Sequence, residues 1–207
     1  MANSEIYTVA QMKEWETAAR ERGLGAGKLM ENAGSRIAED LMKRFPEPQK
    51  TLVICGNGNN GGDGLVTARY LSENGWAVAV LTFHDIDVAP LVGLNLAKLP
   101  DSVRVATEKQ SSDVLTADTQ LVIDAIFGIG FHDQLPQKVA DCLKEVNAHN
   151  AFKVAIDIPS GVHADDGTAA ENSFTAMLTY ALQACKSAHE TSPAKELCGE
   201  VVCINIE

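Results

Sequence analysis

Apolar and polar positions along the chain follow two repeating patterns. Short apolar runs rich in β-branched residues indicate strands that are buried on both faces of a parallel sheet. Longer stretches with an apolar residue at every third or fourth position indicate amphipathic helices. The predicted strands cover residues 51–55, 77–83, 103–107, 121–126, 153–158, 176–180 and 201–206. The predicted helices cover 9–22, 28–45, 91–96, 111–116 and 136–147, and one more begins near Asp63.

Strands that alternate with helices predict an α/β fold, a three-layer sandwich with a mainly parallel sheet and helices on both faces. A chain of 207 residues fits one domain with a substantial core. We expect a single domain over 1–207, with an N-terminal helical extension at about 8–46 and a core at about 50–207. Both helices of the extension are expected to cover the sheet. Glu31 and Asn32 on the second helix are expected to face solvent rather than a ligand cleft.

A glycine-rich segment joins the strand at 51–55 to the helix that follows it. Five glycines fall within nine residues of this segment: Gly56, Gly58, Gly61, Gly62 and Gly64. Such a loop can bring backbone N–H groups close to an anion, and the positive end of the helix dipole adds to the attraction. The segment is therefore predicted to bind phosphate.

The side chains in this loop differ from those of common nucleotide-binding loops. The spacing of the first glycines fits a dinucleotide pattern, but no acid stands at the tip of the second strand, and Asp85 and Asp87 come later. The Lys-Ser/Thr pair of a P-loop is also absent. Two amides and a carboxylate lie in the loop instead, in Asn59-Asn60-Gly61-Gly62-Asp63. A purely structural alternative is that these residues support left-handed turns and that Asp63 caps its helix.

Two further carboxylates, Asp124 and Asp157, lie near the carboxyl ends of the strands at 121–126 and 153–158. Open α/β sheets bind their ligands at this edge. An unpaired acid is costly to bury, so each needs a cation, a set of donors or a ligand hydroxyl; the alternative is that each only fixes its turn. With Asn60 and Ser160, Asp124 makes an all-oxygen set suited to a hard cation, and a single carboxylate favours a monovalent ion.

Charge and composition exclude several classes of protein. A net charge of −11 and a pI near 4.9 argue against nucleic-acid binding. The five cysteines show no CxxC spacing, so we expect a reducing compartment without a disulfide framework or zinc site. No apolar stretch approaches about 18 residues and no signal segment is evident, so a cytoplasmic protein without membrane contact is expected. An organelle protein whose presequence was removed would look the same.

Four segments in a specific order resemble the NAD(P)H-hydrate epimerases, the YjeF N-terminal domain family, over nearly the whole chain. They are Leu29–Gly34, Cys55–Gly64, Asp124–Gly128 and Asp157–Gly161. The resemblance implies a Rossmann-like domain that acts on NADHX and NADPHX, the hydrated forms of NADH and NADPH. The family interconverts their R and S epimers, so that an ADP- or ATP-dependent dehydratase that accepts only S can restore the cofactor.

The resemblance also implies which residues form the site, by matching position. The substrate would be held by Asn59, Asn60, Gly61, Gly62, Asp63, Gly128, Ile129, Gly130, Phe131, His132, Asp133, Gln134 and Asp157. A potassium ion would be held by Asn60, Asp124 and Ser160. Ile129 stands where the family often has Thr, and His132-Asp133 replaces smaller residues. Lys186 matches a family lysine whose role we leave open, and a homodimer is a possible assembly.

Inversion at C6 of the hydrate requires the hydroxyl to leave and water to return on the opposite face. One acid would suffice, because the ring nitrogen donates its lone pair. Asp157 is the first candidate, because it fits substrate contact and burial in an apolar strand would favour its protonated form. Asp63 is the second, expected to stay ionised near a helix N-terminus. One rival function is a non-catalytic nucleotide-binding scaffold or interaction domain. Another is an oxidoreductase, which is disfavoured because this sequence has no Tyr-x-x-x-Lys pair.

Overall fold

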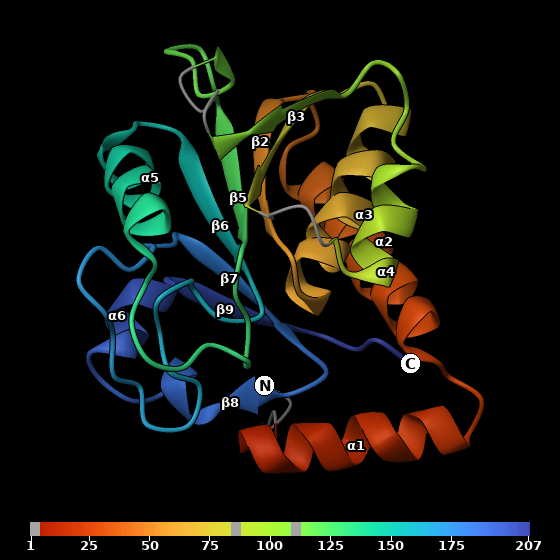
Figure 1. The fold of residues 1–207 in the computed structure, drawn as a ribbon, viewed down its shortest axis with the longest axis vertical. Helices are drawn as coiled ribbons and strands as arrows, with labels where there is room; N and C mark the ends of the chain where they lie inside the picture. Colours follow the sequence, from red (N-terminus) through yellow and green to blue (C-terminus); the bar gives the residue numbers. More distant parts are fainter. Residues whose placement is uncertain (1–4, 84–87, 109–112) are drawn as a thin grey trace.

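The computed structural model describes residues 5–83, 88–108 and 113–207. Its main sheet has seven strands in the order β4-β3-β2-β5-β6-β7-β9, and every neighbouring pair is parallel (Figure 1). The strands are β2 (Lys50–Gly56), β3 (Ala77–Phe83), β4 (Arg104–Thr107), β5 (Leu121–Ala125), β6 (Phe152–Ile156), β7 (Leu178–Leu182) and β9 (Glu200–Ile204). A separate parallel pair joins β1 (Ile6–Tyr7) to β8 (Cys185–Lys186).

Helices cover both faces of this sheet. They are α1 (Val9–Glu21), α2 (Ala26–Arg44), α3 (Asn59–Glu73), α4 (Pro90–Leu96), α5 (Gln137–Ala148), α6 (Ala194–Cys198) and a 3-10 turn, η2 (Ser187–His189). Figure 1 shows α2, α3 and α4 on one side of the sheet and α5 on the other. The predicted α/β sandwich is confirmed.

Strand β2 shows why the sheet is buried on both faces. Val53 and Cys55 belong to the hydrophobic cluster that packs against α2 and α3. Leu52 and Ile54 alternate with them and belong to the cluster that packs against α5. Because successive side chains of a strand point to opposite faces, an uninterrupted apolar run is what a two-sided core requires.

The structure corrects several predicted boundaries. Helix α3 begins at Asn59 rather than near Asp63, so the Asn-Asn-Gly-Gly-Asp segment is its first turn, and the N–H of Gly62 donates to the Gly58 carbonyl over 3.2 Å. Glycine and asparagine form helices poorly, but burial of this turn outweighs their low propensity. Strand β6 ends at Ile156, which leaves Asp157 outside the strand. Strands β7 and β9 and helices α2 and α5 differ from their predicted limits by one or two residues.

Some positions named in the predictions lie outside the residues that the structure describes. Asp85 and Asp87 lie outside the described residues, as do residues 111 and 112 of the predicted helical segment 111–116. In the part of the chain that is described, no helix is both long and apolar enough to cross a membrane.

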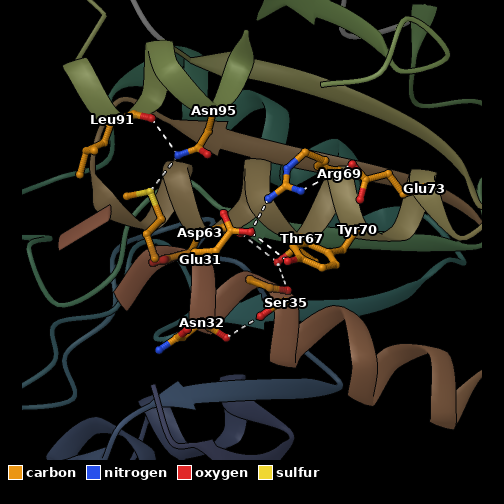
Figure 2. A network of polar contacts seen from close by, with 12 residues as sticks. Glu31, Asn32, Ser35, Asp63, Thr67, Arg69, Tyr70, Glu73, Leu91 and Asn95 are labelled. Atoms are coloured by element: carbon orange, nitrogen blue, oxygen red, sulfur yellow. Dashed lines mark hydrogen bonds and ion pairs between the residues drawn. The ribbon is translucent and has the colours of Figure 1, made fainter. Parts of the chain in front are cut away.

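Helices α2 and α3 pack closely and share a polar network (Figure 2). A Cβ atom on Gly34 would lie 2.5 Å from the Val66 Cβ, so glycine permits this approach. Glu31 Oε1 accepts hydrogen bonds from Arg69 at 2.6 Å and from the Tyr70 hydroxyl at 2.9 Å. The prediction that Glu31 is merely solvated is therefore wrong, because its carboxylate connects the two helices.

Asn32, the neighbour of Glu31, ties α2 to the end of the chain. Its side-chain amide donates to the Ile206 carbonyl over 2.9 Å, so the prediction of a solvated side chain is wrong here too. Glu31 and Asn32 therefore both make contacts that hold α2 in place.

Replacing Glu31 with Gln is expected to lower the free energy of unfolding by about 1 kcal/mol at neutral pH. Burial opposes the charge, but the hydrogen bonds from Arg69 and Tyr70 prevail and lower the pKa of Glu31. A lowered folded-state pKa gives stability above the unfolded value of 4.5 that is lost as the pH falls through the folded value. The difference between wild type and variant should therefore shrink in acid, which denaturant unfolding across pH measures. Glu39→Gln, at an exposed position of α2, is the control; an equal loss in both variants would contradict the role of the network.

Candidate functional site

A cavity of about 630 Å³ opens at the carboxyl ends of the parallel strands. Its walls include the loop after β2 with the first turn of α3, the loop after β5, the turn after β6, and helix α1. The three loops follow β2, β5 and β6, which are neighbours in the parallel sheet, so segments far apart in the sequence meet at one edge. The cavity is the candidate site, and it lies at the sheet edge where the sequence analysis expected ligands to bind.

The floor of the cavity requires glycine. A Cβ on Gly61 would lie 1.9 Å from the Gly56 carbonyl oxygen, and one on Gly56 would lie 2.2 Å from the Ile126 carbonyl oxygen. A Cβ on Gly62 would lie 2.3 Å from the Met30 Cε. Backbone therefore packs directly on backbone beneath the start of α3. The first N–H groups of a helix have no intrahelical acceptor, so this turn can bind an anion.

Asp124 and Ser160 form a buried hydrogen-bonded unit below the cavity. Asp124 Oδ2 accepts from the Ser160 N–H and Oδ1 accepts from the Ser160 hydroxyl, both at 2.7 Å. Asp124 is fully buried, and burial raises its pKa to about 6 although the hydrogen bonds from Ser160 oppose the rise. A buried carboxylate in this position gains from a nearby positive charge.

Asn60 joins this unit through the backbone of Phe127. The Asn60 Nδ2 donates to the Phe127 carbonyl, and the Phe127 N–H donates to the Ser160 hydroxyl, each at 2.9 Å. Asn60 Oδ1 is buried and has no hydrogen-bond partner among the described residues. The three residues predicted to hold a cation are thus brought together.

This oxygen set fits a hard, weakly charged cation. Its candidate ligands are the free Asn60 Oδ1, the Phe127 carbonyl, Ser160 and one carboxylate, Asp124. Within the described ranges, no group of three or more His, Cys, Asp or Glu is placed to hold a metal ion. Neutral oxygens with one negative charge suit neither zinc nor a site for highly charged ions.

Asp157 differs in two ways from its predicted setting. It adopts a left-handed backbone, with φ of 67°, in the turn that follows β6. Its Oδ1 also accepts from the Lys186 ammonium at 2.5 Å, and the Lys186 side chain is completely buried. The apolar surroundings expected around Asp157 are therefore replaced by an ion pair with Lys186.

The imidazole of His189 fixes this ion pair in position. Its Nδ1 accepts from the Lys186 backbone N–H at 2.9 Å, which leaves Nε2 to donate to the Asp157 carbonyl at 2.8 Å. Burial lowers the pKa of His189 and favours this neutral ring. The short segment with β8 and η2 thus holds Lys186 and Asp157 together.

Asp63 also differs from its prediction. It lies in the first turn of α3, is 6% exposed and lines the cavity. Burial is the largest cause that raises its pKa well above the ordinary value, followed by the negative charges of Asp157 and Glu16. For the pKa of Asp63, removal from water therefore outweighs the stabilisation of the carboxylate that was expected from the helix N-terminus.

The loop after β5 contributes only part of its predicted contacts. Gly128, Ile129, Gly130 and Phe131 line the cavity. His132, Asp133 and Gln134 are not part of its lining, and the first two have side chains that are 81% and 85% exposed. Asn59, Asn60, Asp63 and Asp157 line it as predicted, whereas Gly61 and Gly62 support it from below.

Helix α1 is a wall of the cavity that the sequence did not reveal. Met12, Lys13, Glu16 and Arg20 line the cavity, so α1 covers the site rather than the sheet as predicted. Figure 1 shows α1 lying across one end of the molecule, apart from the helices that cover the sheet. A signal was available: Glu16 shares the helix face of the buried Met12 and Ala19, where a purely packing helix would carry apolar residues.

Comparison with known proteins shows the family to which this sequence is similar. The sequence profile of the family described as YjeF-related protein N-terminus matches residues 26–188. An NAD(P)H-hydrate epimerase from Elusimicrobium minutum is 36% identical over 98% of this chain and 95% of its own. An NAD(P)H-hydrate epimerase from Limosilactobacillus fermentum is 33% identical over 96% of this chain and 95% of its own.

Two other relatives extend the comparison. A bifunctional NAD(P)H-hydrate repair enzyme Nnr from Archaeoglobus fulgidus is 33% identical, over 95% of this chain and 40% of its own length. The crystal structure of yeast ynu0 has a TM-score of 0.82 at 23% identity, over 96% of this chain and 87% of that one, which shows the shared fold. With the family profile matching most of its length, this chain belongs to the YjeF-related protein N-terminus family.

Proposed function

We propose that this protein is an isomerase, an NAD(P)H-hydrate epimerase that interconverts the R and S forms of hydrated NADH and NADPH. The observation that carries the proposal is one cavity that contains both an anion-binding helix start and the Asp157–Lys186 pair. The helix start can bind the pyrophosphate of a dinucleotide. The Asp157–Lys186 pair supplies the charged groups that a reaction at the nicotinamide ring needs. The printed names of the relatives support the same activity.

Asp157 is the proposed catalytic carboxyl. The C6 hydroxyl leaves as water while the ring nitrogen lone pair forms an N1=C6 double bond, and water then adds to the opposite face. The intermediate carries a positive charge, which a carboxylate beside the ring stabilises. Substrate contacts are proposed for the first turn of α3 and for Gly128 to Phe131, which line the same cavity.

The direct test starts from purified R hydrate and follows both epimers by chromatography. The expected result is that wild-type protein brings the R form to the equilibrium mixture far faster than buffer alone. Tight binding without any change in epimer ratio would instead favour a nucleotide-binding scaffold.

A potassium ion is proposed at Asn60, Asp124 and Ser160. The buried Asn60 Oδ1 without a partner and the single buried carboxylate support it. A bound cation would fix the Phe127 carbonyl and with it the loop that lines the cavity. In this role it organises the site and takes no part in the reaction.

Potassium is therefore expected to stabilise the folded protein. At about ten times its dissociation constant, an ion that binds only the folded state adds about 1.4 kcal/mol, or roughly 3–6 °C in Tm for a chain of this size. Thermal unfolding in potassium chloride and in choline chloride of equal ionic strength measures this. Asn60→Ala should remove the difference, and identical Tm values in both salts for the wild type would count against the site.

The biological setting is also proposed. Relatives that are bifunctional repair enzymes support functional coupling to an NAD(P)H-hydrate dehydratase, which consumes one of the two epimers. A cytoplasmic location is proposed, which the free cysteines support. A homodimer is the proposed assembly, which sedimentation velocity would test.

A further inference from the structure

The proposed reaction requires a proton for the departing hydroxyl, and Asp157 is poorly suited to supply it. Its carboxylate is held by the buried Lys186 ammonium at 2.5 Å, and a second hydrogen bond to its Oδ1 comes from the Leu182 N–H at 3.3 Å. Its Oδ2 accepts from the Ile129 N–H at 3.2 Å. The two oxygens of Asp157 thus accept three hydrogen bonds from the protein, and neither is placed to donate a proton.

Asp63 has the opposite environment within the same cavity. It is 6% exposed, and no donor to its carboxyl is found among the described residues. It thus resembles a neutral acid rather than a paired carboxylate, because an ionised group at such a position would lack compensation. Two carboxyls in one site with opposite surroundings are the arrangement that separates an acid from a base.

The groups that face Asp63 come from three other parts of the chain. Glu16 on α1 and Asp157 after β6 are negative, and Lys186 on β8 is positive. Glu16 has Lys13 and Arg20 nearby as well as Lys186. The positive charge that favours an ionised Asp63 comes from Lys186, which is already paired with Asp157. The charges of Asp157 and Glu16, together with burial, raise the pKa of Asp63.

We propose that Asp63 is the general acid of the site and that Asp157, paired with Lys186, is the ionised carboxylate that stabilises the cationic ring. This assignment rests on the proposed epimerase function. Asp63 donates its proton to the C6 hydroxyl, the C–O bond breaks with its electron pair passing to oxygen, and water forms. The nitrogen lone pair becomes the N1=C6 bond.

The return step restores every atom and proton. Water adds to C6 from the opposite face, the N1=C6 electron pair returns to nitrogen, and the added water passes one proton back to the Asp63 carboxylate, directly or through the departed water. No oxidant, reductant or other co-reactant is needed. Asp63 is neutral at the start and at the end of each turnover.

The first test reads the protonation state in the free protein and needs no turnover. Infrared difference spectra at about pH 8, between wild type and Asp63→Asn, should show the band of a protonated carboxyl in the wild type alone. Asp124 contributes little there, since burial brings its pKa only to about 6. The matched spectra of Asp157→Asn and Glu16→Gln should retain the band. The assignment would be overturned if the spectra showed no protonated carboxyl at Asp63 at neutral pH. It would also be overturned if the band disappeared only in Asp157→Asn.

The second test is kinetic. Asn is isosteric with a neutral Asp, so Asp63→Asn should keep the Tm of the wild type while kcat falls about 10²- to 10⁴-fold. The wild-type rate should fall as the pH rises and Asp63 ionises, and the remaining rate of Asp63→Asn should lack this fall. A wild type without turnover contradicts the proposed function itself. An active wild type whose rate survives in Asp63→Asn contradicts this inference alone.

Discussion

Replacement of Gly61 by alanine is expected to lower the Tm by roughly 6–12 °C and to abolish tight binding of a dinucleotide. The added methyl group would lie 1.9 Å from the Gly56 carbonyl oxygen, and both groups belong to packed backbone. Neither side can move without shifting β2 or the start of α3. Forced overpacking of this kind costs about 3 kcal/mol, which gives the expected loss in Tm.

Gly58→Ala is the matched control, because it lies three residues away in the same loop. A Cβ there meets nothing within 4 Å, and its φ of −105° suits alanine. Its cost should not exceed about 1 kcal/mol, the usual loss at a helix N-cap. Thermal unfolding and titration with NAD⁺ compare the two variants. Equal effects would show that glycine is not required by the close backbone packing.

Asp157→Asn should reduce kcat by about 10²-fold or more, because it removes the negative charge beside the proposed cationic ring. Asparagine tolerates the left-handed backbone of this position, whereas alanine would add strain. The same variant leaves the buried Lys186 ammonium without its counter-charge. Removal of one member of such a pair costs about 3–5 kcal/mol of stability.

A double variant separates the two effects. Asp157→Asn combined with Lys186→Met removes both charges, so most of the lost stability should return while the activity stays low. Tm values and epimer chromatography from the R hydrate measure the two quantities on the same samples. Recovery of activity along with stability would mean that the pair only supports the fold, and that Asp157 does not act on the substrate.

The layered fold was largely predictable, because its determinants are local in the sequence. The apolar run of β2 and the spacing of Val139, Leu143 and Val146 on α5 state which surfaces must be buried. Boundaries were less predictable. The first turn of α3 has poor helix formers and forms because it packs between Met30 and the Gly56 carbonyl, contacts that local propensity does not contain.

The sequence by itself determined the elements of this protein, the edge of the sheet where the cavity opens and the oxygen set of Asn60, Asp124 and Ser160. These follow from residue types at the ends of strands, which any parallel sheet brings together. Only the tertiary structure decided that Lys186 pairs with Asp157, that α1 supplies Glu16, and that Asp63 is buried with no donor to its carboxyl among the described residues. The physical reason is that the protonation state of a carboxyl depends on its burial and neighbouring charges, and here these come from segments more than 20 residues away in the chain.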